Sequence, residues 1–279
     1  MSTLPFRQVD VFASTPFGGN PVAVVLGAAD LTDAQMADVS DWTNLSECTF
    51  VLPPSTPEAD YRVRIFTLRT ELPFAGHPTL GTARAWLDAG GTPRDPARIV
   101  QECGAGLVPI RRDDARLAFA APPTTRSGPV DEGELARYCD ELGLARDDVV
   151  AAQWVDNGPG WVGLLLRSAE AVLAIEPRVT AGERFIGVAG PHSPDADADL
   201  EVRAFFTGGD GPLREDPVTG SLNASLAQWL TREGVLSAPY VAAQGTALGR
   251  TGRVTVEEAD GELWIGGATD VSIRGEISI

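Results

Sequence analysis

Two titratable residues, His77 and Asp216, each stand directly before a proline in the same local pattern. In both places two residues separate the proline from a glycine, and a hydroxyl-bearing residue follows that glycine. Proline suits the first turn of a helix, because its missing N–H would have no intrahelical partner there. We therefore expect His77 and Asp216 at helix N-termini, where exposed backbone N–H groups and the helix dipole favour an anion. Such a site would bind a carboxylate with titratable groups beside it.

These two segments belong to a longer internal repeat. Residues 202–226 match residues 63–87 at a constant offset of 139 without a gap, and eight of the 25 pairs are identical. A weaker sequence similarity relates Asn20 and the apolar run after it to Asn157 and the apolar run that follows. An offset of half the chain indicates two homologous halves, and coincidence among Gly, Pro and Ala is the alternative. If a pseudo-twofold axis relates the halves, the two helix starts would face each other across a cleft.

The elements expected around these residues are mostly strands. In each half an alternating strand pattern, at 61–68 and 200–207, precedes a turn and a helix rich in small residues. Residues 121–131, with three prolines, are the best linker candidate. Strands outnumber helices without the alternation of a βαβ sheet, so the expected fold class is α+β. Other expected strands are 6–12, 22–26, 49–52, 107–111, 162–166, 254–257, 263–265 and 271–279, and other helices are 32–43, capped by Thr32, and 132–142, capped by Asp131.

The basic residues exclude several classes of protein. All 22 are arginine, and the chain has no lysine. A Schiff-base aldolase, a pyridoxal-phosphate enzyme and a P-loop nucleotidase each need a lysine amine. Nucleic-acid binding depends on clusters of basic residues, whereas this chain has a net charge of −17 and no basic run longer than Arg111-Arg112. We expect no nucleic-acid partner.

The sequence gives no indication of a membrane, a metal or an organic cofactor. It lacks a basic start followed by an apolar segment, and no apolar stretch approaches the ~20 residues of a membrane span. Three cysteines at unrelated spacings and two histidines fit neither a disulfide framework nor a zinc cluster. A G-x-G-x-x-G motif after a strand, which a nicotinamide or flavin would require, is missing. We expect a cytoplasmic protein without a cofactor.

Four stretches, in this order and spacing, resemble the PhzF-like proteins of phenazine biosynthesis: TPFGGNPVAVV (15–25), NLSECTFV (44–51), FAGHPTLGTA (74–83) and EDPVTGS (215–221). The segment QGTALGRTGRVTV (244–256) also resembles that family. The resemblance implies a diaminopimelate-epimerase-like fold, in which two similar domains each wrap a mixed, barrel-like sheet around a central helix. We expect these domains at 1–120 and 130–267, and allow for a last strand, 268–279, that returns to the first.

The resemblance also implies which residues act in the reaction. Glu47, the glutamate of the NLSE motif, would be the proton shuttle, and His77, Asp216 and Ser221 would line the same cleft. The family's type reaction isomerises trans-2,3-dihydro-3-hydroxyanthranilate without a cofactor: a base removes a proton from an allylic ring carbon and the same group returns it at another carbon. This implies an isomerase of antibiotic biosynthesis with a small carboxylate-bearing substrate, and family analogy predicts a homodimer. Substrate binding is assigned to Asn20, Gly76, Gly220 and Ser221.

The residue types fit these roles and also fit plainer ones. A carboxylate that takes a C–H proton and gives it back needs a pKa raised toward the working pH, which burial beside apolar residues produces. Glu47 precedes an apolar strand pattern, but a surface glutamate at a strand start is the alternative. His77 could be a core histidine near a cap, and Asp216 could simply cap its helix. Asp216 paired with His77 could set the orientation or charge of the imidazole, and Ser221 with its N–H could bind the substrate carboxylate.

Three further residues bear on specificity and mechanism. Segment 102–106 imitates the thiol motif of the true epimerases, but it lies away from both expected helix starts, so Cys103 is predicted to be a buried small side chain. Cys48 stands where the family often has threonine; we expect a bystander, with thiol-assisted proton transfer as the alternative. Asn223 replaces a small residue and could select another ring substituent. Two other functions stay open: an amino-acid epimerase or racemase of the same fold, and a non-catalytic protein that binds a small ligand.

Overall fold

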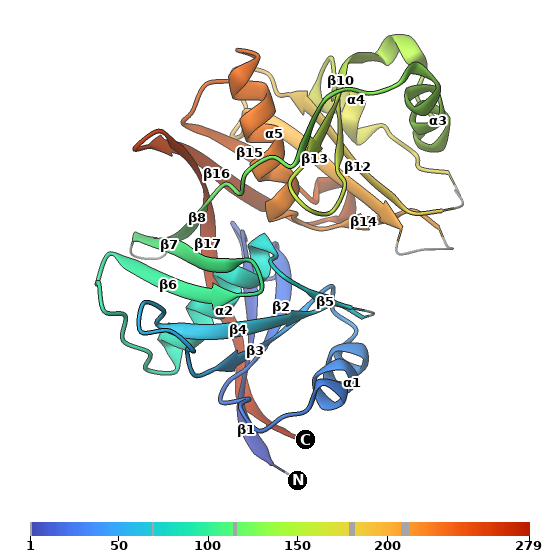
Figure 1. Ribbon diagram of the computed structural model, residues 1–279. Helices are drawn as coiled ribbons and strands as arrows, with labels where there is room; N and C mark the ends of the chain where they lie inside the picture. Colours follow the sequence, from blue (N-terminus) through green and yellow to red (C-terminus); the bar gives the residue numbers. More distant parts are fainter. Residues whose placement is uncertain (1, 69, 114–115, 179–181, 208–211) are drawn as a thin grey trace. The chain divides into compact units, whose positions relative to one another are not determined.

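The computed structural model of the chain describes residues 2–68, 70–113, 116–178, 182–207 and 212–279. Contacts between residues divide the chain into two units (Figure 1). Unit 1 comprises Met1–Ala120 and Gly266–Ile279, and unit 2 comprises Ala121–Ile265. Within the described ranges, no helix is both long enough and apolar enough to cross a bilayer.

Eight strands of unit 1 form a closed ring. Starting from β17, the paired neighbours are β1, β2, β3, β4, β6, β7 and β8, and β8 pairs again with β17. The pairs β2–β3 and β4–β6 are parallel. A short strand, β5, forms a hairpin with the end of β4. The bounds are β1 Thr3–Val11, β2 Asn20–Val25, β3 Cys48–Leu52, β4 Tyr61–Phe66, β5 Glu71–Leu72, β6 Arg98–Cys103, β7 Gly106–Asp113, β8 Arg116–Ala120 and β17 Glu262–Ser278.

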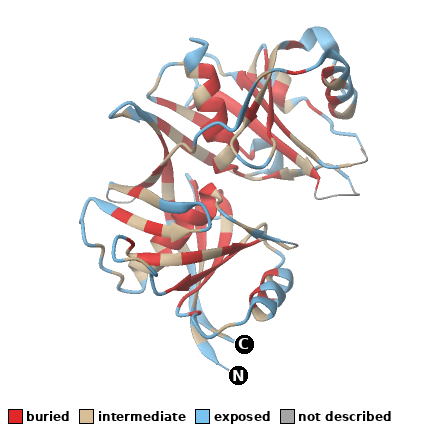
Figure 2. Cartoon of the chain, viewed as in Figure 1, coloured by how far each residue is buried: buried red, intermediate tan, exposed pale blue. Residues whose placement is uncertain are grey.

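Helix α2 (Gly76–Asp88) is the central helix of this barrel, since it contacts β1, β2, β3, β6 and β8. Its first eight residues are all buried, and Figure 2 shows buried residues along it and on the strands around it. Gly81 permits the close packing: a Cβ at this position would lie 2.2 Å from Cγ1 of Val22 in β2. Helix α1 (Asp33–Thr43) packs outside the barrel against β3 and β4.

Unit 2 repeats this architecture with its own row of strands. The order is β9, β10, β11, β12, β13, β15 and β16, with β11–β12 and β13–β15 parallel. A two-residue turn with positive φ at Asp260 and Gly261, the geometry of a tight hairpin, leads from β16 into β17. The bounds are β9 Arg126–Pro129, β10 Val149–Asp156, β11 Val162–Leu166, β12 Arg184–Pro191, β13 Leu200–Thr207, β14 Arg214–Asp216, β15 Tyr240–Gln244 and β16 Gly252–Ala259.

Helix α5 (Gly220–Arg232) is the central helix of unit 2. It contacts β10 and β16, and its Leu222 packs so tightly on β12 that a Cβ on Gly187 would lie 2.2 Å from Leu222 Cδ1. A second core cluster lies outside this helix, where Leu135 and Leu142 pack with Val188 and Phe205. The outer elements are α3 (Glu132–Leu142), α4 (Ala169–Leu173) and two short 3₁₀ helices, η1 (Arg146–Asp148) and η2 (Thr246–Leu248).

The hairpins β4–β5 and β13–β14 define how the two halves correspond. Phe66 pairs with Glu71, and Phe205 pairs with Glu215. The offset is therefore 139 before the turn (205 − 66) and 144 after it (215 − 71). The turn in the second half is five residues longer.

Matching ion pairs support this correspondence. Arg64 donates to both carboxylate oxygens of Glu71, at 2.7 and 2.6 Å. Arg203 does the same to Glu215, at 3.1 and 2.7 Å. The arginines are 139 residues apart and the glutamates 144 (203 − 64 and 215 − 71). Each half thus braces its hairpin with the same bidentate pair.

The constant offset expected through both helices is wrong. Helix α2 begins at Gly76 and α5 at Gly220, which are 144 residues apart (220 − 76). His77 therefore corresponds to Ser221 and not to Asp216, which is the last residue of β14. Neither helix begins at its proline. Helix α2 begins two residues before Pro78, and α5 begins three residues after Pro217.

Most other expectations for the elements are confirmed. The α+β class is correct, with a mixed sheet around a central helix in each unit. Helices α1 and α3 have the predicted N-caps, Thr32 and Asp131. The expected linker 121–131 is partly a strand, because β9 pairs with β10. The two strands expected near the C-terminus are one long strand, β17. Helix α4 and eight strands were not predicted: β5, β6, β8, β9, β10, β12, β14 and β15.

Candidate active site

The first turn of α2 holds His77 against Asn20, the first residue of β2. The His77 side chain is 5% exposed, and its Nδ1 lies 3.4 Å from the amide Nδ2 of Asn20. An amide nitrogen only donates, so Nδ1 accepts this bond and the imidazole hydrogen belongs on Nε2. Burial lowers the pKa of His77 to about 3, and the ring is therefore neutral at neutral pH.

The other side of the imidazole faces Glu47, the residue before β3. Glu47 Oε2 lies 3.3 Å from His77 Nε2; the contact does not meet hydrogen-bond geometry, and both atoms are buried. The Glu47 side chain as a whole keeps 16% of its surface exposed. Since the imidazole is neutral, the contact joins a carboxylate to an N–H dipole and is not an ion pair. The prediction of partial burial for Glu47 is confirmed.

Buried polar contacts fix the elements that carry these residues. The loop before β2 is held where Asp10 Oδ1 accepts the backbone N–H of Gly19, at 2.9 Å. On the second turn of α2, Thr82 donates to the carbonyl of Pro78 at 2.6 Å. Gln101 in β6 donates to Thr79 Oγ1 at 2.9 Å. These contacts tie the loop before β2 to β1 and the first turn of α2 to β6.

In unit 2, Asp216 belongs to a network centred on Gln244. Asp216 Oδ2 accepts the Thr219 hydroxyl at 2.5 Å. The fully buried Gln244 accepts the Thr219 backbone N–H at 3.0 Å and an N–H of Asn223 at 2.8 Å, and it donates to the Asp216 carbonyl at 3.1 Å. Asp216 is not the cap of α5, because that position is Thr219.

Gln244 is the residue of this network that sequence reasoning missed. Its signal was present, since it opens the stretch at 244–256 that resembles the family. Asn223, the candidate for selecting a ring substituent, donates to Gln244 and to the carbonyl of Thr219 at 3.0 Å. These bonds order the start of α5, and the effect of Asn223 on the substrate stays a prediction.

Ser221 occupies in α5 the place that His77 has in α2. Its Oγ accepts the indole N–H of Trp161 at 3.1 Å, and its carbonyl accepts an amide N–H of Asn157 at 2.9 Å. The weak sequence similarity around Asn20 and Asn157 thus has a physical basis. Each asparagine donates to the second residue of a central helix, His77 in α2 and Ser221 in α5.

The two central helices differ from the outer ones in their first turn. Helices α1, α3 and α4 each have a side chain that accepts a backbone N–H at the N-terminus. The N-cap residues of α2 and α5, Ala75 and Thr219, make no such side-chain hydrogen bond. Gly76 and Gly220 begin these two helices, so an incoming anion would meet backbone N–H groups without a side chain in the way.

The cysteines take no part in these arrangements. Cys48 is 1% exposed in the core of unit 1, and burial raises the pKa of its thiol to about 12. A protonated core thiol is a poor proton acceptor, so thiol assistance from Cys48 is disfavoured. Cys103 is partly exposed at the end of β6, and the prediction that it is buried is wrong. Its Sγ donates to the Gly106 carbonyl across the β6–β7 turn, at 3.6 Å.

The structure thus brings Glu47, His77, Asn20 and Gly76 together in unit 1, and Asp216, Gly220 and Ser221 to the start of α5 in unit 2. The expected pairing of His77 with Asp216 joins residues of different units and stays a prediction.

A barrel-like sheet around a buried helix in each unit, with a glutamate–histidine contact at the start of the first helix, defines an epimerase-like fold. The model of the phenazine biosynthesis-like protein family matches residues 9–276. The chain belongs to this family, and the resemblance seen in its motifs is confirmed.

Named relatives agree with this membership. The chain is 35% identical over 246 residues to a trans-2,3-dihydro-3-hydroxyanthranilate isomerase of Pseudomonas fluorescens, covering 87% of this chain and 86% of that one. It is 32% identical over 302 residues to antisense-enhancing sequence 1 of Schizosaccharomyces pombe, covering 99% of each. A phenazine biosynthesis protein of the PhzF family from Bacillus anthracis has the same fold, with a TM-score of 0.84 at 24% identity over the full length of both chains. The protein is an isomerase of this family.

Proposed function

We propose that the protein is a cofactor-independent isomerase that shifts a proton on a small cyclic carboxylic acid, in a reaction like that of trans-2,3-dihydro-3-hydroxyanthranilate isomerase. The relatives that carry this name support the class of substrate. The observation that carries the chemistry is the contact of Glu47 with the neutral imidazole of His77.

In this mechanism Glu47 is first a base and then an acid. Its carboxylate takes a proton from an allylic ring carbon and becomes a carboxylic acid, and the electrons left behind spread over the conjugated system. The same acid then returns the proton to another carbon, so that substrate and product have the same composition. We assign the transfer to Oε1, because Oε2 is buried against His77.

His77 orients this base. A positively charged imidazole would stabilise the carboxylate strongly and make it a weaker base. A neutral N–H dipole favours the carboxylate less, so the basicity that the C–H proton requires is kept. Asn20 maintains this state by donating to Nδ1, which directs the hydrogen of the ring to Nε2.

We further propose that the substrate carboxylate binds at the uncapped N-termini of the central helices, with Asn20 and Gly76 in unit 1 and Gly220 and Ser221 in unit 2 as binding residues. Both termini have backbone N–H groups without a capping side chain, and helix N-termini favour anions. Asp216, oriented by Thr219 and Gln244, would take up a donor group of the substrate. From the family resemblance we also propose a cytoplasmic homodimer.

Exchange of a carbon-bound hydrogen with deuterated water tests the assignment of Glu47. The purified protein with trans-2,3-dihydro-3-hydroxyanthranilate should incorporate deuterium into the product, as measured by mass spectrometry. Glu47→Gln has no basic carboxylate, so its rate of deuterium incorporation should be at least 100-fold lower. Glu258→Gln, which changes an exposed glutamate on β16, serves as the matched control.

Exchange at the control rate in Glu47→Gln would contradict the role of Glu47. Ligand binding by both variants without any turnover of the substrate would favour a non-catalytic binding protein, and inversion of an amino-acid stereocentre would favour an epimerase.

A further inference from the structure

The indole of Trp161 in unit 2 is a buried polar group to which the proposed reaction gives no role. Trp161 is 3% exposed, and its N–H donates to Ser221 Oγ at 3.1 Å. The ring packs edge-on against Phe185, with 5.4 Å between the ring centroids. Asn157 also donates to Ser221, but to its backbone carbonyl. Trp161 is therefore the residue that contacts the Ser221 hydroxyl within the part of the chain that the structure describes.

Local hydrogen bonds fix the loop that carries this indole. Asp156 Oδ1 accepts the N–H groups of Gly158 and Gly160, at 2.8 and 2.6 Å. The Trp161 carbonyl accepts the N–H of Val155 at 3.0 Å. Gly160 has a φ of +96°, which a residue with a side chain rarely adopts. The loop thus delivers Trp161 to the position directly before β11.

Trp161 has the position in unit 2 that Asn20 has in unit 1. Asn20 begins β2, and Trp161 directly precedes β11. Each of these strands pairs antiparallel with the strand before it and parallel with the strand after it. Asn20 donates to the side chain of His77, and Trp161 donates to the side chain of Ser221. Both units therefore place a donor on the side chain of the second residue of the central helix.

The donor from Trp161 restricts what the Ser221 hydroxyl can do. A serine hydroxyl has one hydrogen to donate and two lone pairs that accept, whereas an indole N–H only donates. The contact therefore occupies a lone pair of Ser221 Oγ and leaves its hydrogen for another partner. Ser225, one turn later, donates its own hydrogen to the Ser221 carbonyl at 3.0 Å. Within the described ranges, Ser221 Oγ has no such acceptor, so its hydrogen is available to a ligand.

We propose that Trp161 is a positioning residue, which makes Ser221 a hydrogen-bond donor to the substrate carboxylate at the start of α5. This inference rests on the proposed function, in which Gly220 and Ser221 bind that carboxylate. The indole bond also polarises the O–H group, which strengthens its donation to an anion. Without the indole N–H, the hydroxyl is free to turn to a backbone carbonyl, as serine commonly does in helices.

Calorimetric titration with 3-hydroxyanthranilate tests this proposal. The probe has the carboxylate of the proposed substrate on an aromatic ring and has no allylic proton to shift. Trp161→Phe keeps an aromatic ring without the N–H and should weaken binding by about threefold or more. Ser221→Ala should weaken it by about tenfold or more. Benzothienylalanine at position 161, with sulfur in place of the indole N–H, preserves the ring shape and should reproduce the effect of Trp161→Phe.

A double variant distinguishes positioning from a general loosening of the structure. If Trp161 acts through the Ser221 hydroxyl, its N–H has nothing to position once that hydroxyl is removed. Trp161→Phe combined with Ser221→Ala should therefore bind the probe as Ser221→Ala alone does. Losses that add in the double variant would mean that the indole acts on the ligand by another route.

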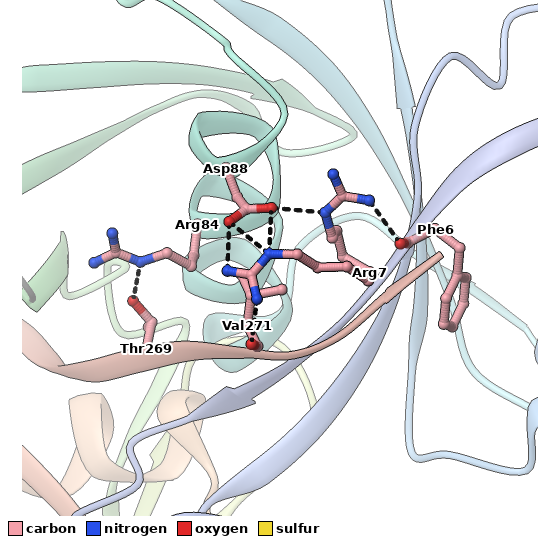
Figure 3. A network of polar contacts seen from close by, with 7 residues as sticks. Phe6, Arg7, Arg84, Asp88, Thr269 and Val271 are labelled. Carbon is pink, nitrogen blue, oxygen red and sulfur yellow. Dashed lines mark hydrogen bonds and ion pairs between the residues drawn. The ribbon is translucent and has the colours of Figure 1, made fainter. Parts of the chain in front are cut away.

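Two variants in unit 1 serve as matched controls. Trp42→Phe removes an indole N–H from a side chain that is 82% exposed. Thr269→Val removes a buried hydroxyl, which accepts Arg84 Nε at 2.9 Å in the network of Figure 3. Both should bind the probe as the wild type does, because neither changes a contact of Ser221.

Three results would overturn the proposal: a loss smaller than threefold with both replacements at position 161, additive losses in the double variant, or an equal loss in Thr269→Val. Failure of the proposed function is a separate result. The probe does not turn over, so a wild type that binds it but does not isomerise trans-2,3-dihydro-3-hydroxyanthranilate would contradict the reaction and not the role of Trp161.

Discussion

At the scale of single residues, the charge state of His77 depends on its neighbours. The sequence pointed to an acid–base pair of His77 with Asp216, because the two stand in the same local pattern. The structure gives His77 an amide donor on one side and the Glu47 carboxylate on the other. These partners come from the first residue of β2 and from the loop before β3, and their meeting depends on strand register that the sequence pattern does not contain.

The depressed pKa of His77 makes stability depend on pH. The folded state binds this proton only near pH 3, whereas an unfolded histidine binds it near pH 6.5. Between these values the unfolded chain holds more protons, so stability is present above pH ~6.5 and is lost as the pH falls toward 3. The free energy of unfolding should fall between pH 7.5 and 5 by about 2 kcal/mol more in the wild type than in His77→Gln.

Urea unfolding at both pH values measures this difference. Glu47→Gln, tested in parallel, shows how much of it depends on the adjacent carboxylate. Parallel pH dependence of the wild type and His77→Gln would mean that folding does not lower the pKa of His77.

At the scale of elements, the sequence predicts what local patterns control. The caps at Thr32 and Asp131 placed α1 and α3 correctly, because a cap and an amphipathic stretch are local signals. The repeat located β4, β13 and the turn after each but misaligned the helices that follow, since an ungapped comparison cannot register a longer turn between Phe205 and Glu215. A small strand such as β15 was missed because burial on both faces removes the alternation that marks a strand.

Close approach of α2 to the barrel predicts a strong effect at Gly81. In Gly81→Ala the new methyl group would lie 2.2 Å from Val22 Cγ1 and 3.0 Å from Val11 Cγ2, so a strand or the helix must shift. We expect a loss of ~1–3 kcal/mol in the free energy of unfolding. Gly275→Ala is the matched control, because a Cβ there meets nothing within 4 Å, and it should change stability by less than ~0.5 kcal/mol.

Urea denaturation of both variants measures this effect. Equal stability of the two variants would mean that α2 has room to shift within the barrel.

At the scale of the whole molecule, the single strand β17 belongs to both units. It begins at Glu262 in unit 2, and from Gly266 onward it belongs to unit 1, where it pairs with both β1 and β8. Deletion of residues 266–279 would open the first barrel and expose the edges of both partner strands. Unit 1 should therefore lose its stable fold, while unit 2 keeps its own strands and α5.

Hydrogen exchange measured by mass spectrometry would detect this separation. Amides of β1 and β8 should lose protection in the deletion variant, and those of α5 should keep it. Removal of residues 278–279 alone is the control and should leave both patterns unchanged. Full protection of β1 after the longer deletion would show that the barrel closes without β17.

The same strand determines the order in which the chain can fold as it leaves the ribosome. Residues 1–120 are made before unit 2, yet the strand that closes their barrel is made after it. Unit 2 has its own helix and strands complete by residue 265, so it can fold while unit 1 still waits with two unpaired edges. The half that contains Glu47 and His77 is therefore completed after unit 2, and any chain that ends before residue 266 lacks a closed barrel around its proposed catalytic base.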